Sequence, residues 1–119
     1  MKVLITDDSS TMLKIIKNTL LSIGIDANDI IEAKDGQEAY EKYTQHQPDL
    51  VLTDWNMPIM NGLEFVSKLR ASGSTTPIIM ITTEANKAEV ITALKAGAND
   101  YISKPFAPEA LKEKISRFV

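Results

Sequence analysis

Two kinds of hydrophobic pattern alternate along the chain. Short apolar runs recur, and each is followed by a longer segment in which apolar residues return every three or four positions. The first pattern is typical of strands buried on both faces of a sheet, and the second of helices with one apolar face. The strand-like runs are residues 2–6, 29–33, 50–53, 78–81 and 101–102. The pattern therefore predicts a strand followed by a helix, five times in succession.

The helix-like segments begin and end at residues that suit helix ends. Ser9, Ser10 or Thr11 can cap the first helix, and two later segments open with an acid or amide three residues before a Glu, the capping-box spacing. Pro108 suits the first turn of the last helix, although its cap position is the unfavourable Ala107. The expected apolar faces are Met12, Ile16, Leu20 and Ile23; Ala39, Tyr40 and Tyr43; Leu63, Val66 and Leu69; Ala88, Ile91 and Leu94; and Leu111, Ile115 and Phe118.

Strands that alternate with helices predict an α/β fold, a five-stranded parallel sheet with helices on both faces. Right-handed crossovers leave few arrangements. A strand order of 2-1-3-4-5 places the topological switch point, where such doubly wound sheets bind ligands, between the first and third strands. The length of 119 residues suits one domain over 1–119.

Composition narrows the classes of function. The net charge of −3 and the scattered Lys and Arg give no electrostatic argument for binding nucleic acid or an anionic membrane. The chain has no Cys, which excludes disulfides and thiolate metal sites. Its apolar runs are far too short to span a membrane, and no signal peptide opens the chain, so we expect a cytoplasmic protein.

Polar residues follow the strands that the pattern places centrally. Asp7 and Asp8 follow the first strand, Asp54 the third, Thr82 the fourth and Lys104 the fifth. Each alone has an ordinary explanation as a turn residue, a strand-end hydroxyl or an exposed lysine. Because the carboxyl ends of parallel strands meet at one edge of the sheet, we expect these side chains to gather there.

Such a group of side chains suits phosphoryl transfer. Three gathered carboxylates repel one another, which raises at least one pKa, and Mg²⁺ would remove the repulsion. Asp54 would act as the nucleophile and become an acyl phosphate. Lys104 would pair with one phosphoryl oxygen, and the Thr82 hydroxyl would donate to another.

The chain resembles response-regulator receiver domains from end to end. The resemblance rests on Asp7-Asp8, Asp54-Trp-Asn-Met-Pro58, Gly62, Thr82, Tyr101 and Lys104-Pro105-Phe106. The stretch from Asp54 to Pro58, the stretch Met80-Ile-Thr-Thr-Glu-Ala85 and the lack of an output domain are similar to the single-domain chemotaxis type in particular. The resemblance implies the flavodoxin-like form of the doubly wound fold.

The resemblance also implies roles for individual residues. It implies that Asp54 accepts a phosphoryl group from the phosphohistidine of a sensor histidine kinase. Asp8, Asp54 and the backbone carbonyl of Asn56 would hold Mg²⁺, with Asp7 acting through water. The Lys104–Pro105 peptide bond would be cis.

Signal output follows from the same resemblance. Thr82 and Tyr101 would be the switch residues, and the fourth helix, fifth strand and fifth helix would form the face that binds a downstream target. A flagellar motor switch protein is the expected target and a phosphatase a possible partner. We expect a monomer that catalyses only its own phosphorylation and dephosphorylation.

One residue departs from the family pattern. The position after Thr82 usually carries Ala, Gly or Ser, and here it is Thr83. Its β-branched side chain could narrow access to the phosphoryl group, which puts the dephosphorylation rate in question.

Three alternatives remain. The chain could relay phosphate to another histidine domain or serve as a phosphate sink. It could be a hydrolase of the haloacid-dehalogenase kind, but that family needs a second Asp where this chain has Asn56. It could bind FMN, but Asp7 and Asp8 would then repel the phosphate that the loop must hold.

Overall fold

The computed structural model describes residues 1–83 and 86–118. It contains a five-stranded parallel sheet of order β2-β1-β3-β4-β5, which confirms the predicted topology. Asp29 is not part of the second strand as predicted, because it ends a short 3₁₀ turn, Ala27–Asp29, that is capped by Asp26. The strands are β1 Val3–Thr6, β2 Ile30–Ala33, β3 Leu50–Thr53, β4 Ile78–Thr82 and β5 Asp100–Ser103.

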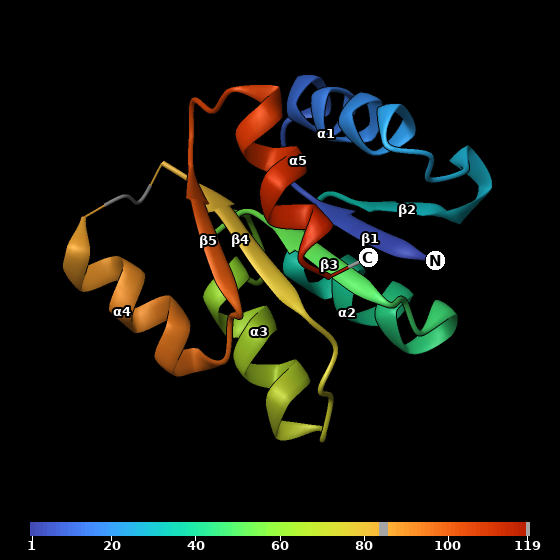
Figure 1. Ribbon diagram of the computed structural model, residues 1–119. Coiled ribbons are helices and arrows are strands. Elements are labelled where there is room, and N and C mark those ends of the chain that lie inside the picture. The colour runs from blue at the N-terminus through green and yellow to red at the C-terminus, as the bar shows by residue number, and fades with distance from the viewer. Residues whose placement is uncertain (84–85, 119) are drawn as a thin grey trace.

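Helices cover both faces of the sheet (Figure 1). α1 and α5 pack on one face, where their apolar residues join a core with β1, β3 and β4. α2, α3 and α4 pack on the other face around a second core that contains Phe65 and Met80. The helices are α1 Ser10–Ser22, α2 Gly36–His46, α3 Gly62–Ala71, α4 Lys87–Ala96 and α5 Pro108–Ser116. None of the described helices is long and apolar enough to cross a membrane.

The predicted helix starts are confirmed, with one change of detail. Ser9 caps α1, and Asn61 forms a complete capping box with Glu64 at the start of α3. At α2 the Asp35 carboxylate accepts from the Glu38 N–H, but the Glu38 carboxylate accepts from the N–H of Lys34 rather than from that of the cap. The opening turn of α2 is therefore fixed to the residue that leaves β2.

The predicted apolar faces need three corrections. In α1 Leu13 is buried while Met12 is only partly covered, and in α3 Phe65 takes the buried place expected for Leu63. In α4 the expected face was wrong, because Ala88 is exposed, Ile91 is 42% exposed and Leu94 is 43% exposed. The buried residue there is Ala93, whose small side chain suits close packing of α4 on its neighbours.

Candidate functional site

The parallel ladder carries the predicted residues to one edge of the sheet. Beyond the paired strands, the N–H of Asp54 donates to the carbonyl of Thr6 at 2.9 Å, and the N–H of Lys104 donates to the carbonyl of Thr82 at 2.9 Å. Asp7 and Asp54 thus leave adjacent strands side by side, as do Thr82 and Lys104. These backbone hydrogen bonds place the ends of four strands at one edge of the sheet, as predicted.

Three carboxylates meet at this edge. One oxygen each of Asp7, Asp8 and Asp54 lies within 4.8 Å of the others. Asp7 and Asp54 are buried, whereas Asp8 is exposed. Burial raises the pKa of Asp54 first and the charge of Asp7 raises it further, while Lys104 and the N–H of Trp55 oppose the shift. The predicted rise in a carboxyl pKa is confirmed, although desolvation contributes more than repulsion.

Lys104 bridges the two buried carboxylates. Its Nζ lies 2.6 Å from Asp7 Oδ2 and 3.3 Å from Asp54 Oδ2. The second oxygen of Asp7 accepts from the N–H of Ser9 at 2.9 Å, and Asp54 Oδ1 accepts from the N–H of Trp55 at 2.7 Å. Each carboxylate is thus oriented by a backbone donor on one oxygen and by Lys104 on the other. The peptide bond after Lys104 is cis, as the resemblance implied.

The donor set fits a hard divalent cation. All three side chains offer carboxylate oxygens, and the exposure of Asp8 lets water complete a coordination shell, as Mg²⁺ prefers. Asn56 lies two residues after Asp54 in the loop that leaves β3, and it is exposed.

Two glycines let this loop lie close to its neighbours. A Cβ on Gly62 would lie 1.9 Å from the carbonyl oxygen of Asp54, and the N–H of Gly62 donates to the carbonyl of Trp55 at 2.8 Å. A Cβ on Gly36 would lie 2.3 Å from the carbonyl oxygen of Met60, which accepts from the N–H of Gly36 at 2.8 Å. The sequence indicated Gly62 but not Gly36, because the contact of Gly36 is with Met60, which is distant in the sequence.

Thr82 and Tyr101 lie on the same face of the sheet. Tyr101 pairs with Met80 and Thr82 with Ser103, so the two side chains are diagonal neighbours. Thr82 is fully buried, while the Tyr101 ring packs against the core beneath α2, α3 and α4 with its hydroxyl oxygen buried. Thr83 is exposed. Glu84 and Ala85, which belonged to the motif quoted for the resemblance, lie outside the described residues.

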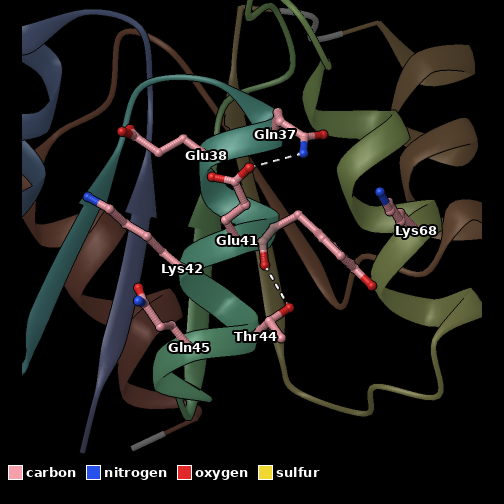
Figure 2. A pocket seen from close by; sticks show the side chains of 8 residues that line it. Gln37, Glu38, Glu41, Lys42, Thr44, Gln45 and Lys68 are labelled. Atoms are coloured by element: carbon pink, nitrogen blue, oxygen red, sulfur yellow. Dashed lines mark hydrogen bonds between the residues drawn. The ribbon is translucent and has the colours of Figure 1, made fainter.

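A hollow on the outer side of α2 contains none of the predicted site residues (Figure 2). Its volume is about 560 Å³, and it is lined by α2 side chains and by Lys68 of α3. The Lys68 ammonium stands 4.2 Å from the centre of the Tyr40 ring. Its lining mixes acidic, basic and amide side chains, and these do not form a recognisable binding or catalytic arrangement. The sheet edge therefore remains the candidate functional site.

The fold and the site define a doubly wound α/β domain with an acidic cluster at its sheet edge, and comparison with known proteins gives the family. Residues 3–116 match the family described as the response regulator receiver domain. The chain belongs to this family, whose members are signalling proteins rather than conventional enzymes. Family membership decides against the hydrolase and FMN interpretations.

Several relatives are similar over nearly the whole chain. It is 59% identical to a "Chemotaxis protein CheY homolog" of Campylobacter jejuni, covering 97% of this chain and 89% of the relative. It is also 59% identical to "Chemotaxis protein CheY1" of Helicobacter pylori, covering 97% and 94%. The solved structure of the Vibrio cholerae chemotaxis response regulator CheY4 is 35% identical, with a TM-score of 0.89 over 99% of this chain and 98% of that one.

Proposed function

We propose that residues 1–119 form a single receiver domain in which Asp54 is the phosphoacceptor. The observation that carries this assignment is the position of Lys104 Nζ, between Asp7 and Asp54 in a cluster open to solvent at Asp8. A lone buried carboxylate would be protonated or inert. A carboxylate with a fixed cation on one side and an open acidic rim on the other can attack and then hold a phosphoryl group.

The proposed step transfers the phosphoryl group from a histidine. An oxygen of Asp54 bonds to phosphorus, the bond between phosphorus and the histidine nitrogen breaks, and its electron pair stays on the imidazole. The Trp55 N–H holds Asp54 Oδ1, which leaves the carboxylate in one orientation. Lys104 pairs with a phosphoryl oxygen, and the Thr82 hydroxyl donates to another. The same groups serve hydrolysis of the acyl phosphate, the only other reaction proposed.

Mg²⁺ is the proposed cofactor. Asp8, Asp54 and the Asn56 carbonyl would hold it directly, and Asp7 through water. When bound, it supplies positive charge to the phosphoryl oxygens. The proposal is supported by the three carboxylates, whose oxygens lie within 4.8 Å of one another.

The proposed pathway is chemotaxis in the cytoplasm, with a sensor histidine kinase as phosphodonor. The names of the relatives in Campylobacter and Helicobacter support it. The target, such as a flagellar motor switch protein, would bind a monomer at the face formed by α4, β5 and α5. On this face Ile91 and Leu94 present apolar surface. A relay or sink role would instead need a second histidine domain, which phosphorylated protein should capture in a pull-down.

The test is phosphorylation of wild type and Asp54→Asn with acetyl phosphate and Mg²⁺. Wild type should gain one phosphoryl group by mass and lose it to hydroxylamine, as an acyl phosphate does. The isosteric amide is not a nucleophile, so Asp54→Asn should stay unlabelled while keeping its circular dichroism spectrum. Labelling of both proteins would place the acceptor elsewhere.

A further inference from the structure

Ile59 has an unusual backbone and an unusual exposure. Its φ is +69°, and the N–H of Met60 donates across it to the carbonyl of Pro58 at 2.7 Å, which makes Ile59 the centre of a γ-turn in the strained, positive-φ form. A β-branched residue rarely adopts this conformation. Ile59 is 81% exposed, whereas the other exposed large apolar residues of the described chain are at most 43% exposed.

The surrounding loop fixes Ile59 in this position. The N–H of Gly62 donates to the carbonyl of Trp55, which joins the two ends of the loop. The N–H of Gly36 donates to the carbonyl of Met60, which directly follows Ile59. Met57 is buried and Met60 is half-buried against the core, so the chain on either side of the exposed pair Pro58 and Ile59 is held inward. Gly or Asn would fit the turn with less strain. An apolar side chain is therefore held in a fixed, exposed position that neither burial nor backbone preference favours.

The loop joins Asp54 to α3 and therefore borders the acidic site. A phosphohistidine carries negative charge, and it must approach a rim where Asp8 is exposed and two more carboxylates lie behind it. Even with Lys104 and the proposed Mg²⁺ present, the three carboxylates leave this edge without net positive charge, so long-range electrostatic attraction of the donor is weak. A protein donor needs another source of affinity close to the acceptor, and an apolar side chain in a fixed position supplies it.

We propose that Ile59, together with the exposed ring of Pro58, is a docking contact for the protein domain that presents the phosphohistidine. The matching surface on that domain is an apolar depression beside its histidine. The inference rests on the proposed function and adds to it the recognition of the donor. A small phosphodonor has no such surface, so its reaction with Asp54 does not depend on Ile59.

The test compares two donors that break the same kind of phosphorus–nitrogen bond. One is the phosphorylated histidine-phosphotransfer domain of a chemotaxis histidine kinase, and the other is phosphoramidate. With the protein donor, Ile59→Asn should lower the second-order rate of transfer by about tenfold, the effect of losing one apolar anchor. Ile59→Leu should stay within about twofold of wild type. With phosphoramidate all three proteins should react equally.

A matched control is Leu21→Asn, which removes a 40% exposed apolar residue at the end of α1 far from Asp8 along the helix. It should leave both rates unchanged. If Ile59→Asn lowers the transfer rate equally with both donors, Ile59 shapes the site itself. If Ile59→Asn leaves the rate with the protein donor unchanged, the donor docks elsewhere. Either result overturns the inference. If Ile59→Asn lowers only the rate of phosphatase-stimulated hydrolysis, Ile59 contacts a phosphatase and not the donor, which would also overturn the inference. Failure of wild type to react with phosphoramidate would instead overturn the proposed function.

Discussion

Burial of the Asp54 carboxyl works against its ionisation and so against the stability of the metal-free chain. Its pKa is raised above 3.8, first by burial and then by Asp7, and Lys104 only partly opposes this. The folded chain therefore holds the Asp54 proton more tightly than the unfolded chain does. The contribution of Asp54 to stability accordingly falls as the pH rises from 3.8 through the raised pKa of the folded state.

Asp54→Asn removes this charge and keeps the shape of the side chain. In EDTA at neutral pH we expect a higher Tm than that of wild type, and below about pH 3, where both side chains are neutral, the two Tm values should converge. Thermal unfolding followed by circular dichroism measures both. A neutral-pH Tm for Asp54→Asn at or below that of wild type would show that Lys104 outweighs the desolvation of Asp54.

Single residues also mark the limit of what the sequence could predict. Asp7, Asp54 and Thr82 were predictable, because a residue that follows a buried parallel strand must lie at the sheet edge. The bond between Lys104 and Asp7, 97 positions apart, was not predictable, because both carboxylates were equally available partners. The γ-turn at Ile59 gave no signal either, since Gly or Asn would normally mark a positive φ.

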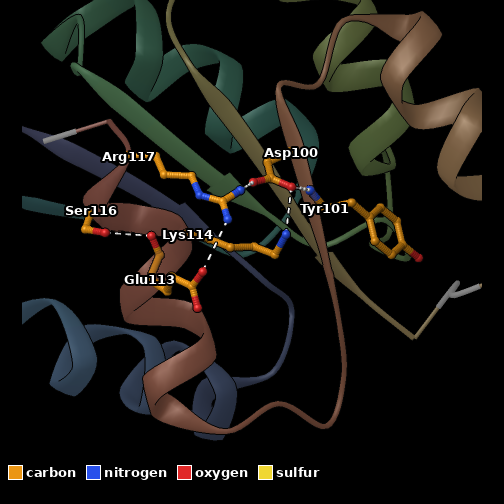
Figure 3. Close-up of polar contacts among 6 residues, drawn as sticks. All are labelled: Asp100, Tyr101, Glu113, Lys114, Ser116 and Arg117. Atoms are coloured by element: carbon orange, nitrogen blue, oxygen red, sulfur yellow. Dashed lines mark hydrogen bonds and ion pairs between the residues drawn. The ribbon is translucent and has the colours of Figure 1, made fainter.

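At the scale of elements, an ion network joins the start of β5 to the end of α5 (Figure 3). Asp100 lies 2.8 Å from Lys114 and 3.3 Å from Arg117. Burial raises the pKa of Asp100, but the hydrogen bonds from Lys114 and the Tyr101 N–H, with the charges of Lys114 and Arg117, outweigh it and lower that pKa. The network therefore stabilises the fold above pH 3.8, and this stability is lost as the pH falls through the lowered pKa.

Asp100→Asn should lower the free energy of unfolding by about 1 kcal/mol at neutral pH, because these ion pairs are partly exposed. The difference should shrink in acid, below the lowered pKa. Urea unfolding at the two pH values measures it. Glu113→Gln is a suitable control, since Glu113 meets only the outer side of Arg117 at 3.3 Å and is itself 72% exposed. If Glu113→Gln lowered the free energy of unfolding as much as Asp100→Asn does, Asp100 would have no special role.

The α4 helix shows why element-level prediction was incomplete. Its existence and its end at Gly97 followed from periodicity and from the helix-stopping glycine. Its orientation did not, because the three-residue spacing of Ala88, Ile91 and Leu94 describes an apolar stripe without saying what covers it. Strand order was predictable for the opposite reason, since right-handed crossovers constrain every βα unit at once.

At the scale of the whole molecule, metal binding should be linked to folding. Only the folded chain brings Asp7, Asp8 and Asp54 together, so Mg²⁺ should raise the Tm with concentration, by an amount equivalent to about 2.7 kcal/mol at one hundred times its Kd. Asp8→Ala should weaken this response and, in EDTA, raise the Tm slightly by removing repulsion. Scanning calorimetry with increasing Mg²⁺ tests both. Equal Mg²⁺ responses in the two proteins would mean that Asp8 is not a ligand.

The proposed switch connects the site with the distant face of α4, β5 and α5. Thr82 and Tyr101 are diagonal neighbours on one face of the sheet, and the Tyr101 hydroxyl oxygen is buried. We expect phosphorylation to favour the inward position of the Tyr101 ring. As the Thr82 hydroxyl moves toward the phosphoryl group, it leaves space beneath α4 that favours this position. A few kcal/mol of differential stabilisation is sufficient, comparable to one or two charge-assisted hydrogen bonds.

This coupling must be reciprocal, because it is a free energy shared by two sites. A target peptide that binds the α4–β5–α5 face should therefore tighten the binding of beryllofluoride, a mimic of the phosphoryl group, at Asp54. Fluorescence of Trp55, which is half-buried beside Asp54, can follow the titration with and without the peptide. Wild type should show a shift of about tenfold in apparent affinity, typical of allosteric coupling, and Thr82→Ala should show much less. Equal shifts in both would mean that the signal reaches the face by a route that does not include the Thr82 hydroxyl, and the partly buried ring of Tyr101 would then be ordinary packing.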